Sequence, residues 1–92
     1  MSAEPITSYV ITDHALTELK RRGLSEEAID GILKNPGQRT EVRSGRVVVQ
    51  SRVQELGSEY LARVFVDIDR APAEVVTAYR TSKISKYWRD DV

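Results

Sequence analysis

The stretch that decides the fold is RVVVQSRVQELGSEYLARVFVDI, residues 46–68. Its apolar residues alternate with polar ones, which is the period of a strand with one buried face. Gly57 and Ser58 interrupt the alternation, so residues 46–56 and 59–68 are predicted to be antiparallel strands joined by a tight turn. One face of the second strand carries Tyr60, Ala62, Val64, Val66 and Ile68, and the other carries Leu61, Arg63, Phe65 and Asp67.

The residues before this hairpin show helical spacing instead. Thr12 or Asp13 can cap a first helix, and Gly23 is placed to end it. Ser25 can cap a second helix, which Asn35-Pro36-Gly37 stops. Two helices are therefore predicted between residues 12 and 35.

Shorter segments complete the predicted domain. Residues 38–43 and 73–79 are predicted to be strands, residues 9–11 could add a short one, and Ser82 can cap a terminal helical turn. We expect an α+β domain with two N-terminal helices packed on one face of a four-stranded antiparallel sheet. Residues 1–9 are predicted to be a flexible lead-in, and residues 10–92 a single domain.

Composition limits the kind of chemistry. The 92 residues include no cysteine and one histidine, so disulfides and thiolate sites are excluded, and we expect no metal and no cofactor. Neither a signal peptide nor an apolar run of membrane-spanning length is visible, which predicts a cytoplasmic protein without membrane contact. With 14 basic and 14 acidic residues the net charge is zero, which argues against strong non-specific binding to nucleic acid.

Charge and aromatic residues are nevertheless concentrated near the C-terminus, in the segment YRTSKISKYWR, residues 79–89. Its cations can bind phosphate, and its phenols can transfer protons. Trp88, the sole tryptophan, is predicted to belong to the core with Ile84. His14, near the start of the first helix, is either a neutral general base or a histidine with only a structural role.

Three stretches resemble a known family: ITDHAL at 11–16 with RGLS at 22–25, Asn35-Pro36, and VTAYRTSK at 76–83 with KYW at 86–88. The chain resembles the small bacterial and phage proteins grouped as domain of unknown function 4258. By analogy that family belongs to the RelE/ParE-like toxin superfamily. The resemblance implies two helices followed by a curled antiparallel sheet, with RNA as the substrate and a cognate antitoxin as a protein partner.

The RelE branch implies a metal-independent endoribonuclease toxin, and the ParE branch implies a gyrase poison without a nuclease site. In the first case a base activates the ribose 2′-hydroxyl, cations hold the phosphate and an acid protonates the leaving oxygen. Carried onto this sequence, the catalytic residues are His14, Arg80 and Tyr87. The phosphate-binding residues are Arg46, Arg63, Lys83 and Lys86.

The residues leave other functions open. The same C-terminal segment could belong to a non-catalytic module that binds a protein or a nucleic acid. Exposed strand edges could instead serve oligomerisation, and we expect a monomer or a weak dimer. Proximity of His14 to Arg80 and Lys83 is the arrangement that a catalytic role for His14 requires.

Overall fold

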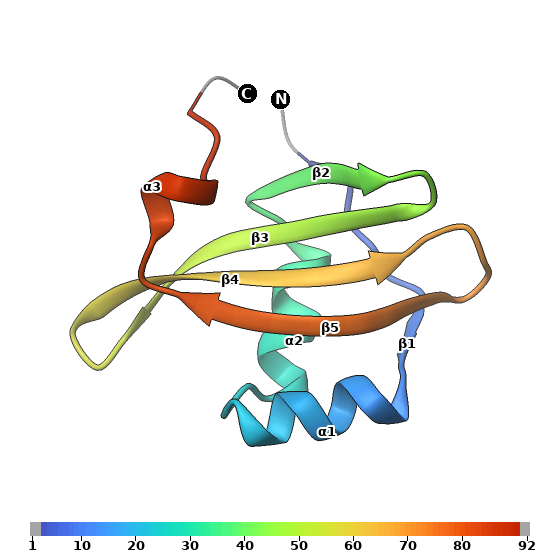
Figure 1. The fold of residues 1–92 in the computed structure, drawn as a ribbon, viewed down its shortest axis with the longest axis horizontal. Helices are drawn as coiled ribbons and strands as arrows, with labels where there is room; N and C mark the ends of the chain where they lie inside the picture. The colour runs from blue at the N-terminus through green and yellow to red at the C-terminus, as the bar shows by residue number, and fades with distance from the viewer. Residues whose placement is uncertain (1–2, 91–92) are drawn as a thin grey trace.

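Three helices and five strands are formed by residues 3–90, the part of the chain that the computed structural model describes (Figure 1). Their order along the chain is β1 (Tyr9–Ile11), α1 (Asp13–Arg21), α2 (Glu26–Lys34), β2 (Gln38–Arg43), β3 (Arg46–Glu55), β4 (Ser58–Asp67), β5 (Ala73–Thr81) and α3 (Ile84–Tyr87).

Both long helices begin at a hydroxyl side chain that caps the first turn. Thr12 Oγ1 accepts a hydrogen bond from the Ala15 N–H, and Ser25 Oγ accepts one from the Ala28 N–H, each at 3.1 Å. Such caps satisfy N–H groups that have no partner within the helix. Gly23, with a φ of 71°, follows α1 in the left-handed region. The predicted starts of both helices and the end of the first are confirmed.

The sheet differs from the predicted one. All five strands join a mixed sheet in the order β1-β5-β4-β3-β2. Strands β2 to β5 pair antiparallel in succession, as expected, but β1 pairs parallel with β5, with Tyr9 opposite Ala73 and Ile11 opposite Val75. The prediction of a four-stranded, wholly antiparallel, RelE-like sheet is therefore wrong.

The physical reason is the distance along the chain between the two paired segments. β1 has only three residues, and its partner begins at Ala73, after both long helices and three other strands. A run of three residues is too short to show a strand period, and no local turn connects it to its partner. The preceding residues also join the domain: Ile6 is buried, and its N–H donates to the Leu33 carbonyl at 2.8 Å.

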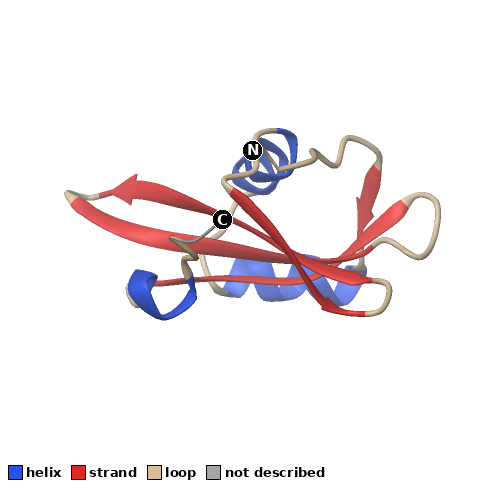
Figure 2. Cartoon of the chain, turned by 90° about the horizontal axis from the view of Figure 1, so that it is seen from above, coloured by secondary structure: helices blue, strands red, loops and turns tan. Residues whose placement is uncertain are grey.

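The two faces of the sheet have different partners. Figure 2 shows α2 on one side of the strands and α3 on the other. The α2 face forms the hydrophobic core with the helices, through Ala15, Leu19, Ile29, Ile32, Leu33, Val47, Val49, Ala62, Val64, Val66, Val75 and Ala78. The opposite face, here the α3 face, carries the alternate residues of β3 and β4. The predicted alternation of buried and polar faces in β4 is confirmed from Ala62 to Val66, but Asp67 is buried although it lies on the polar face.

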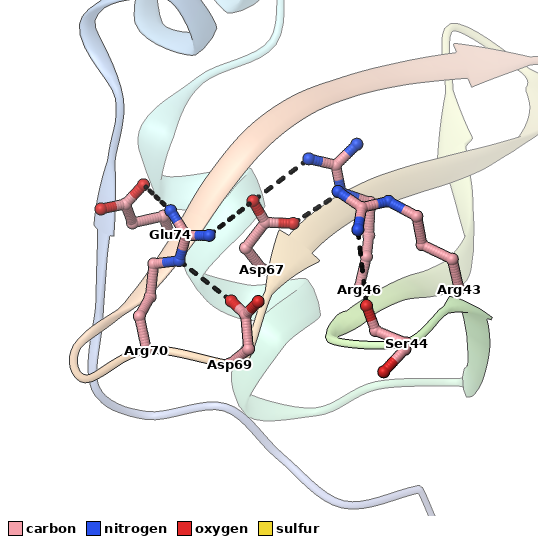
Figure 3. A network of polar contacts seen from close by, with 7 residues as sticks. All are labelled: Arg43, Ser44, Arg46, Asp67, Asp69, Arg70 and Glu74. Atoms are coloured by element: carbon pink, nitrogen blue, oxygen red, sulfur yellow. Dashed lines mark hydrogen bonds and ion pairs between the residues drawn. The ribbon is translucent and has the colours of Figure 1, made fainter.

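An ionic network ties together the two turns at the end of the sheet that is remote from α3 (Figure 3). Asp67 at the end of β4 accepts hydrogen bonds from Arg46 Nε at 2.5 Å and Nη2 at 3.1 Å. Arg70 lies 3.7 Å from Asp67 and bonds to Asp69 at 3.0 Å. Gly45 fits beside this network because its φ is 85° and an added Cβ would lie 2.8 Å from Asp69 Oδ2.

We predict that Asp67→Asn destabilises the protein by about 2 kcal/mol, because Arg46 then loses a charged acceptor in a largely buried pair. The pKa of Asp67 is lowered, chiefly by its hydrogen bond from Arg46. Its contribution to stability is therefore present above about pH 4 and is lost as the pH falls through the lower folded pKa. Chemical denaturation at several pH values should show wild type and variant converging in acid. A constant difference between them at all pH values would contradict this assignment.

Candidate functional site

Arg63 lies at the centre of a polar and aromatic cluster on the α3 face. Its neighbours across the sheet are Gln50 of β3 and Tyr79 of β5. Because residues directly opposite one another point to the same face, the three side chains form a row. Arg63 Nε donates to Gln50 Oε1 at 3.0 Å, and Nη1 donates to the Tyr79 hydroxyl at 2.7 Å. These bonds fix the plane of the guanidinium.

Three aromatic rings surround this guanidinium. Its central carbon lies 4.1 Å from the ring centroid of Tyr87, 5.4 Å from that of Phe65 and 5.8 Å from that of Tyr79. The rings of Phe65 and Tyr79 are stacked, with centroids 6.1 Å apart. The negative faces of such rings attract the cation but do not neutralise its charge.

Arg63 has no carboxylate partner among residues 3–90, unlike the arginines on the neighbouring strands β3 and β5. Arg46 pairs with Asp67, Arg52 with Glu59 and Arg80 with Glu55. Within residues 3–90, Arg63 has no carboxylate within 4 Å, and its hydrogen-bond acceptors are a neutral amide and a phenol. A half-buried cation with neutral partners only is suited to an anionic ligand.

Tyr87 adds a group that can transfer protons. The pKa of its phenol is lowered, first by a hydrogen bond from Tyr79 and then by the charges of Lys86 and Arg63, against the effect of desolvation. The Lys86 ammonium lies 5.3 Å from the centre of the Tyr87 ring. Because these neighbours stabilise the phenolate, Tyr87 is better suited to act as a general base than a tyrosine without them.

Two buried glutamines hold the C-terminal segment over the sheet. Gln50 Nε2 donates to Gln38 Oε1 at 2.8 Å and to the Tyr87 carbonyl at 3.1 Å. Gln38 bonds both backbone groups of Arg89, accepting from its N–H at 3.0 Å and donating to its carbonyl at 2.5 Å. The glutamines therefore set the position of α3 and of the Tyr87 ring above Arg63.

Trp88 fixes the other side of this segment. The Arg52 guanidinium lies 5.5 Å from the Trp88 ring, and the indole lies against Gly37, just before β2. A Cβ added at Gly37 would lie 3.0 Å from a ring carbon of Trp88 and 2.9 Å from the Gln50 carbonyl oxygen. The close approach therefore requires glycine at this position.

The structure brings together some of the residues predicted from the sequence. Arg63, Tyr87 and Lys86 share the cluster on the α3 face. Lys83 is exposed immediately before α3. These four residues come from β4 and the C-terminal segment only.

The other predicted site residues lie elsewhere. His14 is in α1, its side chain 81% exposed, and its Nε2 lies 3.9 Å from Glu18 of the same helix. Arg80 lines a cavity beside α2 and donates two hydrogen bonds to Glu55. Arg46 belongs to the network of Figure 3. Figure 1 shows α1 beneath β5, whereas α3 lies on the other side of that strand, so β5 separates the helix that carries His14 from the helix that carries Tyr87.

The contribution of Gln38 and Gln50 was not predicted from the sequence. One signal was available: Gln50 follows three valines in a strand, at a position where an unpaired polar side chain would be costly to bury. Its partners could not be predicted, because Gln38 and Tyr87 come from separate segments. Phe65 was predicted to lie on the same strand face as Arg63, but no functional role was predicted for it.

Comparison of the chain with protein-family models, curated proteins and solved structures found no match. The family resemblance therefore stays a prediction from the sequence motifs. Within residues 3–90, no helix has the length and apolar character needed to span a membrane. The described part of the chain also contains no group of three His, Cys, Asp or Glu side chains that could hold a metal ion.

We predict that Gly37→Ala displaces Trp88, because the new methyl group would overlap both the indole and the Gln50 carbonyl. Overpacking of this kind costs about 1–3 kcal/mol. Fluorescence of the sole tryptophan should shift to longer wavelength as the ring becomes more exposed. Gly31→Ala is the matched control, since a Cβ there meets no atom within 4 Å and a helix interior favours alanine. An unchanged spectrum for Gly37→Ala would contradict this packing.

We also predict that Tyr79→Phe raises the pKa of Tyr87 toward its ordinary value, because it removes the hydrogen bond that contributes most to lowering it. Tyr60→Phe, on the other face of β4, should leave Tyr87 unchanged. Titration of assigned tyrosine ring signals by NMR distinguishes these effects. In wild type, Tyr87 should ionise well before Tyr9, whose pKa burial and Asp30 raise to about 12. If Tyr87 has the same pKa in wild type and in Tyr79→Phe, the hydrogen bond from Tyr79 to Tyr87 is contradicted.

Proposed function

We propose that this protein is a metal-independent endoribonuclease that binds a substrate phosphate beside Arg63. One observation supports this above all: the half-buried Arg63 guanidinium, which has no carboxylate of residues 3–90 within 4 Å, lies 4.1 Å from the ring of a tyrosine whose pKa is lowered. The guanidinium offers a planar set of donors to phosphate oxygens. The Tyr87 phenol offers a base close enough to the Arg63 guanidinium for both groups to contact the same nucleotide.

In the proposed reaction Tyr87, as phenolate, takes the proton of a ribose 2′-hydroxyl. The 2′-oxygen attacks the adjacent phosphorus, the bond from phosphorus to the 5′-oxygen breaks, and the leaving oxygen takes a proton from the Lys86 ammonium. The products are a 2′,3′-cyclic phosphate and a 5′-hydroxyl. Arg63 stabilises the negative charge that develops on the phosphate oxygens.

The residues differ from those that the family resemblance implied. His14 and Arg80 lie outside the proposed site, and Tyr87 takes the role of the base. The stacked rings of Phe65 and Tyr79 offer a surface for a nucleotide base. A toxin role and an antitoxin partner rest on the sequence resemblance alone.

The neutral net charge is compatible with RNA binding if charge is distributed unevenly. Lys83, Lys86 and Arg63 belong to the α3 side, while the acidic first turn of α2 lies on the other. With three cations at the site, the logarithm of the RNA binding constant should fall by about 2 for each tenfold rise in salt. This modest dependence distinguishes the site from that of a strongly basic protein.

We predict that Arg63→Ala lowers RNA cleavage by about 10²–10³-fold, because it removes the phosphate-binding cation. Tyr87→Phe should lower cleavage by about 10²–10⁴-fold through loss of the base, with little change in RNA affinity. His14→Ala is the control and should cleave like wild type. The measurement is cleavage of single-stranded RNA by purified protein in the presence of a chelator, with binding followed in parallel.

The outcomes separate two functions. RNA that is bound in an Arg63-dependent manner but left intact would contradict catalysis and favour the second candidate, a non-catalytic nucleic-acid binding module. If wild type neither binds nor cleaves RNA, both are contradicted. Loss of cleavage in His14→Ala would return the catalytic role to α1.

A further inference from the structure

Leu56 occupies the tip of the β3–β4 hairpin, where its side chain is fully exposed. Its φ is 50° and that of Gly57 is 78°, so both central residues of the two-residue turn have a positive φ. Asparagine and glycine favour this backbone, whereas a leucine is strained in it. Leu56 is also fully exposed, at 102% of its reference area. Single exposed leucines are common, but a leucine held at a positive φ is not, and this makes Leu56 a candidate for a contact outside the folded monomer.

The hairpin that carries Leu56 projects beyond the rest of the sheet (Figure 1). β2 pairs with β3 only as far as Gln50, and β5 pairs with β4 only from Leu61. Residues 51–60 therefore form a two-stranded arm with a neighbouring strand on neither edge. An arm of this kind is marginally stable by itself and leaves backbone groups available for a partner.

An apolar groove lies at the base of the same arm. It encloses about 300 Å³, and its lining includes Ala28, Gly31 and Ile32 of α2 together with Val53 and Ala62 of the sheet. A Cβ added at Gly31 would meet no atom within 4 Å, so the helix surface is open at this point. The groove has room for a leucine side chain.

We propose that two copies of this chain associate by exchanging β3–β4 arms, with Leu56 of each copy seated in the α2 groove of the other. A two-fold axis makes both contacts at once, because each copy carries one exposed Leu56 and one groove. A chain with zero net charge has no overall repulsion from its own copy. The groove lies on the α2 face, so this association leaves the Arg63 cluster accessible and is independent of the proposed ribonuclease activity.

Sedimentation equilibrium of the full chain tests the association directly. Wild type should move from monomer to dimer mass as its concentration rises. Leu56→Asn should weaken the dimer by about a hundredfold or more, since both symmetry-related leucines are lost. The variant should also fold at least as stably as wild type, because asparagine favours this turn. A monomeric wild type at all concentrations, or an unchanged dimer in Leu56→Asn, would overturn the proposal.

Disulfide trapping tests the geometry, since the chain has no cysteine of its own. A copy carrying Leu56→Cys mixed with one carrying Ala28→Cys should form a cross-linked pair under mild oxidation. Lys34→Cys is the matched control: it lies on α2 but does not line the groove, and should not be trapped by Leu56→Cys. Equal trapping of the two positions would overturn the proposed arrangement.

Discussion

The side-chain amide of Gln50 connects the parts of the α3 face on which the candidate site depends. Its oxygen accepts from Arg63 on β4, while its nitrogen donates to Gln38 on β2 and to the Tyr87 carbonyl. A buried amide with both of its ends bonded is strongly oriented, because each lost bond would leave a polar group without a partner. Through Gln50, the C-terminal segment is held where the Tyr87 ring covers Arg63.

This constraint explains how a small neutral chain can hold a cation in a partly buried position. Three of its strand arginines, Arg46, Arg52 and Arg80, pair with carboxylates. Arg63 is oriented instead by neutral acceptors and by three rings, which leaves its charge available to an anion. The pKa of Tyr87 is lowered first by the hydrogen bond from Tyr79 and then by the charges of Lys86 and Arg63, so the residues around the guanidinium also favour the phenolate.

Local patterns in the sequence were sufficient for much of the fold. Hydroxyl caps at Thr12 and Ser25 and the alternation through residues 46–68 predicted both long helices and the central hairpin. The pairing of β1 with β5 was not predicted, because the contact is made between segments at opposite ends of the chain. The candidate site could likewise be predicted only in part. Arg63, Tyr87 and Lys86 were named from residue type, but the separation of His14 and Arg80 from them is a property of the three-dimensional arrangement.

Phosphate binding by Arg63 is tested most directly by the Arg63 Nε–H signal in an NMR titration. Addition of a short single-stranded RNA should shift this signal and the ring signals of Tyr87 with one common affinity, and inorganic phosphate should shift the same signals more weakly. The shifts should weaken as the salt concentration is raised. If Arg63 and Tyr87 do not respond while other cations of the chain do, phosphate binds elsewhere on the molecule and the proposed role of Arg63 is contradicted.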